Sequence, residues 1–458
     1  MKQPLLWLPV ATVLSLAVPT AYAKVSEAEA AKLGKELTCT GAEVAGNKEG
    51  TIPAFSGKWL GTPPGIKYMP NVGQHPVDPY PEDKPLYVIT AANMDKYADK
   101  LTDGQKAMFK RYPDTFRIPV YQGRRDFRYS DKVCEVSKKS AVQAELIDNG
   151  FGFNGLKGVS PFPIPKTAME LLANMNFPHR AYTENTPERD VADVSSNGAI
   201  SWGRIWQRNF AIVNSPEQMG KPMEGIMSMS RTATLLPERD KGAITVSHEP
   251  VNFARGKRLA WTYDPGTRRV RQLPEFGFDG PLVGTSGKMT TDQDRLMNGS
   301  PERFEWKMLG KREIFIPANS YRVHANTVKY ADLLKKGHAN PDYMRYELRR
   351  VWVLEGTLKE GYRHIFGRRV MFLDEDNWQA SVGDYYDTRG QLWQHAFINH
   401  YYAFDMNAWQ AGTSFYHDLN GGGYVGYNLF QERQSGPVLN AGDKAELFTP
   451  AALRSAGN

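Results

Sequence analysis

The sequence has few of the features by which enzymes and metalloproteins are usually recognised. It contains only two cysteines in 458 residues, and it has no C-x-x-C pair, no Walker A loop and no G-x-S-x-G elbow. None of its nine histidines stands in H-E-x-x-H or another compact ligand spacing. The sequence therefore predicts neither a bound metal nor a cofactor.

A match to the dinucleotide-binding pattern is excluded by its context. Residues 150–155, GFGFNG, fit G-x-G-x-x-G, but Pro161, Pro163 and Pro165 follow closely. Prolines at this spacing prevent the helix whose N-terminus would hold a pyrophosphate. We expect no nucleotide site here.

Positive charge is not concentrated in any block of the chain. The formal net charge is +7, and lysines and arginines are scattered among acidic residues. Such a chain lacks the basic stripe that follows a nucleic acid, so that partner is not expected. A weak attraction to anionic lipid headgroups, and with it a transient contact with a membrane surface, stays open.

The one long apolar run lies at the N-terminus and has the form of a Sec-type signal peptide. Lys2 precedes an apolar run over residues 5–18, which ends in Ala21-Tyr22-Ala23. The run is shorter than the roughly 20 residues that a membrane anchor needs. We predict that residues 1–23 are removed, that the mature chain begins at Lys24, and that the soluble protein is exported to the periplasm, with the outer membrane as a candidate site of association.

The two cysteines have two interpretations. Cys39 and Cys134 enter an oxidising compartment, and one pair in such a chain favours one disulfide. The alternative is two unpaired buried thiols, because sequence does not show distance.

Turn and cap signals divide the mature chain into an extension and a mainly β body. Residues 24–100 read as an extension, mostly loop, and residues 101–458 as one large domain; together they form one globular unit. Strand signals dominate from 199 to 402, and serial hairpins imply a large antiparallel sheet that curls to bury its apolar face. A few short helices are expected at 26–37, 102–111, 166–175 and 326–336.

Two hairpins are expected within the strand-rich region. In residues 258–273, the tetrapeptide Asp264-Pro265-Gly266-Thr267 has the turn residues that a β-turn requires. In residues 304–316, Gly310 is the expected turn.

Residues 345–378 combine a strand pattern with an acidic triplet. Alternation predicts an apolar face with Tyr346 and Leu348 and a polar face with Arg345, Glu347, Arg349 and Glu355. Asp374, Glu375 and Asp376 would suit paired catalytic carboxylates or Ca²⁺ ligands, but consecutive turn residues point in different directions. We interpret the triplet as a solvated turn and nearby His364 as a structural histidine.

Several segments resemble one family over nearly the whole mature chain. They include LTCTGAEVAGNKEGTIPAFSG (37–57), YDPGTRRVRQLPEFGFDGP (263–281), NGSPERFEWKMLGKREIFIP (298–317) and FTPAALRSAG (448–457). They look like the Gram-negative family called domain of unknown function 1329 (DUF1329). The family usually has proline where Cys39 stands, so a disulfide here would belong to a subgroup.

The resemblance implies a relation to the lipoprotein carriers LolA and LolB and supplies no catalytic residues. It implies a curled antiparallel half-barrel whose apolar concave face is closed by short helices. It also implies an outer-membrane β-barrel protein and a resistance-nodulation-division type exporter as partners.

The sequence is compatible with three functions: a carrier, a hydrolase and a structural subunit. One is a carrier of a lipid or other hydrophobic molecule, whose cavity would be lined by Trp261, Tyr263, Leu348, Trp352, Leu354, Phe366 and Phe372. The same residues would equally serve as ordinary core. The alternatives are a hydrolase of an envelope glycan or ester that uses the acidic triplet and His364, and a structural subunit of an envelope complex.

Overall fold

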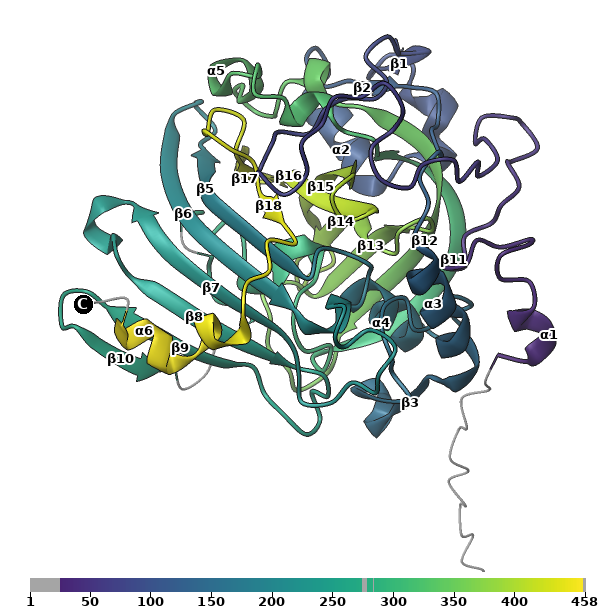
Figure 1. Ribbon diagram of the computed structural model, residues 1–458. Helices are drawn as coiled ribbons and strands as arrows, with labels where there is room; N and C mark the ends of the chain where they lie inside the picture. Colours follow the sequence, from purple (N-terminus) through teal and green to yellow (C-terminus); the bar gives the residue numbers. More distant parts are fainter. Residues whose placement is uncertain (1–24, 274–277, 283, 456–458) are drawn as a thin grey trace, which may run out of the picture.

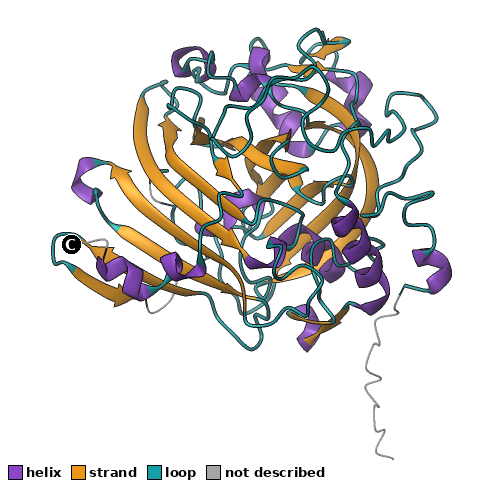
Figure 2. Ribbon diagram, viewed as in Figure 1, coloured by secondary structure: helices purple, strands orange, loops and turns teal. Residues whose placement is uncertain are grey.

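The computed structural model describes residues 25–273, 278–282 and 284–455, and one large curved β-sheet dominates it (Figure 1). The predicted signal peptide and the predicted first mature residue, Lys24, lie outside the described residues. Helices are few and short compared with the strands (Figure 2). The prediction of a mainly β fold built on a large curled antiparallel sheet is therefore confirmed.

Sixteen strands within the described ranges form the large sheet. Their order across it is β1-β2-β12-β13-β14-β15-β16-β17-β5-β6-β7-β8-β9-β10, with β11 paired to β12 and β18 paired to β5. The bounds are β1 Tyr87–Ile89, β2 Ile118–Val120, β5 Thr183–Val194, β6 Ile200–Ala211, β7 Ile226–Leu236, β8 Ile244–Pro250, β9 Leu259–Asp264, β10 Arg269–Gln272, β11 Phe304–Pro317, β12 Tyr346–Leu358, β13 Arg368–Asp374, β14 Ala380–Tyr386, β15 Leu392–Ala403, β16 Ala408–Asp418, β17 Gly423–Leu429 and β18 Val438–Leu439.

The remaining elements surround this sheet. A small separate sheet consists of β3 (Glu145–Ile147) and β4 (Gly152–Asn154). The α-helices are α1 Glu27–Ala30, α2 Asp103–Arg111, α3 Asp131–Gln143, α4 Ala168–Asn176, α5 Tyr330–Leu333 and α6 Pro450–Ser455. Two 3₁₀-helices matter below, η5 (Thr291–Leu296) and η6 (Arg322–His324).

Local signals placed several elements correctly. Thr102 and Thr167 cap α2 and α4 in capping boxes with Gln105 and Glu170, as the predicted helices require. Asp264 turns β9 into β10, and its Oδ1 accepts hydrogen bonds from the N–H groups of Gly266 (2.8 Å) and Thr267 (3.2 Å).

The predicted hairpin at Gly310 is wrong. Residues 304–317 form one strand, β11, which pairs along its length with β12, and the register shifts between Met308 and Lys311. Gly310 lies in this irregularity with φ +90°. A left-handed glycine serves a β-bulge as well as a turn, so the residue type alone does not distinguish them.

Two helix predictions also need correction. The helix expected over 326–336 is reduced to α5, and the one expected over 26–37 is reduced to α1. The longest helix, α3, was not predicted, because its buried positions include Ser137 and Ser140 beside Val133 and Val136. Buried hydroxyl residues conceal the apolar period of such a helix.

The N-terminal extension is a long loop that a disulfide fixes to α3. Cys39 and Cys134 are bonded, with their Cα atoms 5.0 Å apart, so the predicted pair is confirmed. Cys134 lies on α3, and the indole N–H of Trp378 donates to the carbonyl of Thr40 (2.8 Å). The extension is thus held at two successive residues, Cys39 and Thr40.

The two faces of the sheet pack against different elements. Val353, Phe372 and Val382 belong to one large core with residues of α2, such as Met108 and Phe109. The opposite face, here called the inner face, carries the intervening side chains of the same strands. It packs against α4 and the segment around η5, with Leu171, Leu172, Met175, Met289 and Leu296 buried against it.

The far end of the sheet is covered by the C-terminal segment. His248 hydrogen-bonds to the carbonyl of Phe448 (2.6 Å), and Leu453 of α6 is buried against Val246 and Tyr263. In Figure 1, α6 lies across β8–β10. Within the described ranges, no helix combines the length and apolarity needed to cross a bilayer.

Acid should destabilise the protein through His324, which is fully buried. Its Nε2 accepts a hydrogen bond from the N–H of Thr413 (2.9 Å), and its Nδ1 hydrogen-bonds to the carbonyl of Ser320 (2.6 Å). This arrangement fixes the neutral ring, and burial lowers its pKa from 6.5 to about 3. Because the folded-state pKa is below the unfolded one, the contribution is complete above pH 6.5 and is lost as pH falls toward 3.

We therefore expect the titration of His324 to lower the free energy of unfolding by about 2 kcal/mol as the pH falls from about 7.5 to about 5. The measurement is urea unfolding at both pH values for the wild type and for His324→Gln, whose amide supplies one donor and one acceptor. The variant should lose about 2 kcal/mol less than the wild type over this interval. Equal losses would mean that His324 is not the titrating group.

Candidate functional site: a cavity on the inner face

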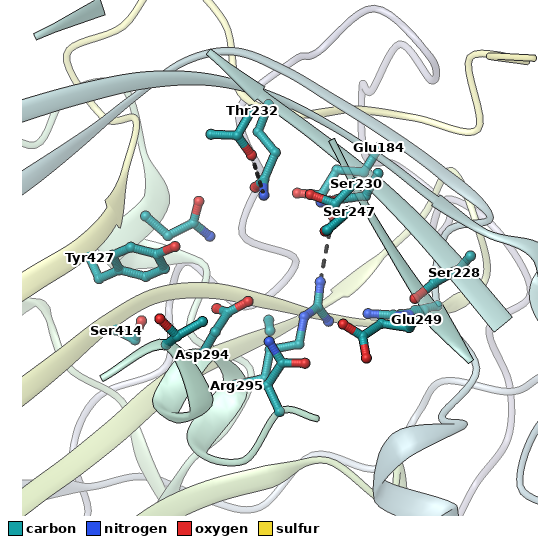
Figure 3. Close-up of a pocket in the computed structure, with 18 of the residues that line it drawn as sticks. Glu184, Ser228, Ser230, Thr232, Ser247, Glu249, Asp294, Arg295, Ser414 and Tyr427 are labelled. Atoms are coloured by element: carbon teal, nitrogen blue, oxygen red, sulfur yellow. Dashed lines mark hydrogen bonds and ion pairs between the residues drawn. The ribbon is translucent and has the colours of Figure 1, made fainter. Parts of the chain in front are cut away.

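A cavity of about 370 Å³ lies on the inner face of the curved sheet (Figure 3). One wall comes from β5–β8 and the other from β14–β17, two parts of the sheet that are distant in the sequence. Residues from 175–181 and 291–299 contribute most of the remaining lining, with Arg258, Leu282 and Gln379. The volume falls in the range of small-molecule sites.

The wall formed by β6, β7 and β8 is polar and arranged in rows. Side chains that alternate along each strand reach the same face, so residues paired across strands form lines. Asn209, Ser230 and Ser247 form one row. Gln207, Thr232 and Thr245 form the next, with Gln207 Nε2 donating to Thr232 Oγ1 (3.4 Å). This wall offers donors and acceptors to a ligand.

The rest of the lining mixes apolar side chains with polar and charged ones. The β14–β17 side presents Ala380, Ile398 and Ala411, which belong to the same packed face as α4, together with Gln410 and Ser414. Other apolar residues in the lining are Met175, Val191, Leu282 and Met297. The cavity therefore combines rows of hydroxyl and amide groups with an apolar patch.

Arg295 projects into the cavity from η5 toward Glu184 on β5 (Figure 3). Its guanidinium Nη2 lies 3.7 Å from Glu184 Oε2, and Nη1 is buried without a hydrogen-bond partner among the described residues. Arg295 and the next residue, Leu296, both have positive φ, +56° and +69°. Two successive non-glycine residues in this region store backbone strain.

Hydrogen bonds from the sheet hold η5 in this conformation. Tyr416 Oη donates to the carbonyl of Gln293 (3.0 Å), and Tyr385 Oη donates to the carbonyl of Leu296 (2.8 Å). These contacts bracket Arg295. Buried tyrosines on two strands thus fix the strained segment, and strain that is fixed in this way is typical of binding and catalytic sites.

A buried ion pair anchors the start of η5. Asp292 accepts hydrogen bonds from Arg369 Nη2 (2.8 Å) and from His364 Nε2 (3.1 Å). Burial alone would raise the pKa of the Asp292 carboxyl, but the charge of Arg369 and the bond from His364 hold it well below its ordinary value. Asp292 therefore stays ionised and positions η5.

Arginines slightly outnumber carboxylates in the described lining. The arginines are Arg180, Arg189, Arg258 and Arg295, and the carboxylates are Glu184, Glu249 and Asp294. Most of these groups already have partners. Glu249 is paired with Arg258, Glu184 accepts from Gln410 Nε2 (3.2 Å), and Arg189 Nη2 donates to Tyr427 Oη (2.7 Å).

Two further groups in the lining respond to the charge of Arg295. Burial, and then the charge of Arg295, lower the pKa of Arg180 to about 9. The same two causes lower the pKa of His400 to about 3, so this histidine is neutral. Arg180 Nε and His400 Nε2 are also buried without hydrogen-bond partners in the described part of the chain.

Comparison with known proteins places the chain in a family. The model of DUF1329, described as a protein of unknown function, matches residues 88–454. The chain belongs to the DUF1329 family. An uncharacterized protein of Pseudomonas aeruginosa is 38% identical over 450 residues, which cover 97% of this chain and 96% of the relative.

Solved structures similar to this DUF1329 protein are more distant. A DUF1329 family protein from Desulfovibrio piger is 12% identical with a TM-score of 0.40, over 60% of this chain and 92% of that one. A LolA superfamily protein from Nitrosomonas europaea is 12% identical with a TM-score of 0.37, over 62% and 98% of the two chains.

The seven predicted cavity residues of this DUF1329 protein do not form one wall. None of them is among the residues that line the cavity. Trp352, Leu354 and Phe366 lie together on the inner face, where packing against neighbouring residues fills the space. Leu348 and Phe372 belong to the other large core, and Trp261 and Tyr263 pack beneath α6.

The acidic triplet is not a solvated turn, so that prediction is wrong. Asp374, Glu375 and Asp376 are 1%, 2% and 2% exposed. The N-terminal extension packs beside them through Thr40 and Glu43. Their ion-pair partners lie after β2 and on β11 and β12: Arg125, Lys311, Arg349 and Arg350.

The polar face predicted for β12 is likewise covered. Arg345, Glu347 and Arg349 are buried, and Arg345 pairs with Asp83 of the extension (2.9 Å). His364 is buried and hydrogen-bonds to Asp292, as described above, which is the environment expected of a structural histidine. None of these charged residues lines the cavity.

The alternation of small hydroxyl residues in β7 is a sequence signal for the cavity wall that the predictions above do not include. In β7, Ser228, Ser230, Thr232 and Thr234 occupy alternate positions, and all four line the cavity. A strand face of small hydroxyl residues ordinarily indicates exposure to solvent. Within the described ranges, no cluster of at least three His, Cys, Asp or Glu residues could hold a metal ion.

Proposed function

We propose that this DUF1329 protein binds and carries an amphipathic molecule of the lipid class, without covalent chemistry. The observation that carries the proposal is the cavity on the inner face, which has both an apolar patch and rows of polar groups. The apolar patch would receive the hydrocarbon part of the ligand, and the rows of hydroxyl and amide groups would receive the polar part. A purely apolar ligand would leave those polar groups without partners, which costs free energy.

The exported location and the partners belong to the same proposal. The disulfide between Cys39 and Cys134 is consistent with an oxidising compartment such as the periplasm. An inner-membrane exporter of the resistance-nodulation-division type would deliver the ligand, and an outer-membrane β-barrel protein would receive it. The hydrolase alternative is less well supported, because its proposed groups, Asp374–Asp376 and His364, lie outside the cavity.

Filling the cavity should weaken ligand binding without unfolding the protein. Ala411 lines the cavity from β16, and its replacement by Phe places a ring in space that a ligand would occupy. We expect Ala411→Phe to weaken binding of a fluorescent fatty-acid probe at least about ten-fold, which corresponds to about 1.4 kcal/mol. Mass spectrometry should also find less co-purified lipid in this variant.

A substitution outside the cavity is the control that separates a loss of ligand binding from a loss of stability. Leu354 is fully buried on the same face but does not line the cavity. Leu354→Ser should lower stability while the folded fraction binds the probe as tightly as the wild type does. A wild-type protein that binds no probe and yields no lipid would contradict the proposed function.

A further inference from the structure

Four nitrogen atoms of residues that line the cavity are buried and lack a hydrogen-bond partner among the described residues. They are Arg180 Nε, Arg189 Nε, Arg295 Nη1 and His400 Nε2, and the carboxylate oxygen Glu249 Oε2 lacks a partner as well. A buried polar atom without a partner costs free energy, so such groups are rare in folded proteins. The nitrogens of Arg180, Arg295 and His400 belong to side chains whose charges interact, and together they indicate a group that is missing from the cavity.

The charges around these atoms define the missing group. Arg180 and His400 both feel the positive charge of Arg295, which lowers their pKa values. The carboxylate of Glu184 is engaged by Gln410 and Thr186 as well as by Arg295, and one oxygen of Glu249 is engaged by Arg258. Across the described lining, four arginines face three carboxylates, including Asp294, so positive charge exceeds negative charge by one.

The backbone supports a binding role for Arg295 in particular. Its φ of +56° would be adopted at lower cost by glycine or asparagine. Tyr385 and Tyr416 hold the segment in place on both sides of it. An arginine kept at such a position and aimed into a cavity is explained by what its guanidinium binds.

We propose that Arg180, Arg295 and His400 bind an oxyanion of the ligand, a phosphate or a carboxylate. The guanidinium of Arg295 supplies the charge and a planar pair of donors, Arg180 Nε adds a third, and neutral His400 donates through Nε2. The rows of Ser, Thr, Asn and Gln on β6–β8 would then bind hydroxyl groups next to the anion. This inference rests on the proposed function and specifies the head group of the carried molecule.

The test compares ligands that differ only in the anion. Binding of dioctanoyl phosphatidic acid, dioctanoylglycerol and inorganic phosphate is measured by isothermal titration calorimetry. We expect the wild type to bind the phosphatidic acid at least about ten-fold more tightly than the diacylglycerol, because charge-assisted hydrogen bonds are the strong ones. A parallel titration with octanoate in place of inorganic phosphate compares binding of a carboxylate with binding of a phosphate.

Arg295→Asn should remove most of this preference while its melting temperature stays equal or rises. Asparagine tolerates positive φ better than arginine does, so the variant relieves strain as it loses the guanidinium. Arg180→Gln, which leaves η5 untouched, should weaken the same preference. Arg208→Asn is the matched control, since Arg208 is paired with Asp443 (2.8 Å) and does not line the cavity, and it should bind like the wild type.

The outcomes separate the two proposals. Equal binding of the phosphatidic acid and the diacylglycerol by the wild type, or an unchanged preference in Arg295→Asn and Arg180→Gln, overturns the oxyanion site and leaves the carrier intact. Binding of inorganic phosphate that depends on Arg295, with no binding of either lipid, supports the oxyanion site and overturns the carrier. Loss of all binding in Arg208→Asn as well would mean that the effect is not local to the cavity, and would overturn the site.

Discussion

Replacing Asp376 by alanine should cost about 3 to 5 kcal/mol of unfolding free energy, because it leaves buried guanidinium groups without their counter-charge. Asp376 Oδ1 lies 2.7 Å from Arg125 Nη2, and Asp376 Oδ2 lies 2.8 Å from Arg349 Nη2. All three side chains are at most 2% exposed. Burial alone would raise the pKa of Asp376, but the two arginines hold it below its ordinary value.

The loss is measured by urea unfolding at neutral pH, with a surface carboxylate as control. Asp240 ends a short surface 3₁₀-helix, and its one ion pair among the described residues is with the exposed neighbour Arg239, so Asp240→Ala should change stability by less than about 1 kcal/mol. A double-mutant cycle with Arg125→Met tests the pairing itself. The double variant should be less damaged than the sum of the single variants, and strict additivity would show that Asp376 and Arg125 do not interact.

The acidic triplet shows why some of the structure could not be predicted from the sequence. Residues 374–377 have ordinary turn composition, and turns of this composition are normally solvated. What buries them is the extension around Glu43 together with the segment around Arg125, and both are distant in the sequence. No local pattern in residues 345–378 indicates that contact, so the acidic triplet was predicted to be exposed to solvent.

The sequence predicts the fold better than it predicts the site, because the sequence signals for the fold are local. The turn at Asp264 and the caps at Thr102 and Thr167 each depend on residues a few positions apart, and all three were found. Alternation also identified β12 and β13. Which face of a strand lines a cavity depends on the curvature of the whole sheet, and alternation does not contain that information.

The candidate site illustrates this limit. Trp261 and Tyr263 have the aromatic character expected of a lipid cavity, yet α6 covers them on the face opposite Thr245 and Ser247. Arg295 was not singled out, since nothing in its neighbours reports a positive φ or a projection into a cavity. The polar alternation in β7 was visible, but only the structure shows that its hydroxyl groups face inward.

Removing the disulfide should cost about 4 to 5 kcal/mol, chiefly because it frees the unfolded chain. The two cysteines are 95 positions apart, and in the chain-entropy model a loop of roughly this length gives this value. We expect the double variant Cys39→Ala, Cys134→Ala to fold, because the residues that line the cavity and most residues of both large cores lie beyond the extension. Its urea midpoint should nevertheless fall well below that of the wild type.

The same variant should loosen the extension locally. The carbonyl of Thr40 accepts from Trp378, and Arg125 Nη2 donates to the carbonyl of Glu43 (2.7 Å), so noncovalent contacts such as these then hold residues 38–57. Limited proteolysis should cut this loop sooner in the variant than in the wild type, while probe binding in the cavity stays unchanged. Thiol labelling of denatured, unreduced wild type should find no free cysteine. Two labelled cysteines, or equal stability of variant and wild type, would refute a stabilising bond between Cys39 and Cys134.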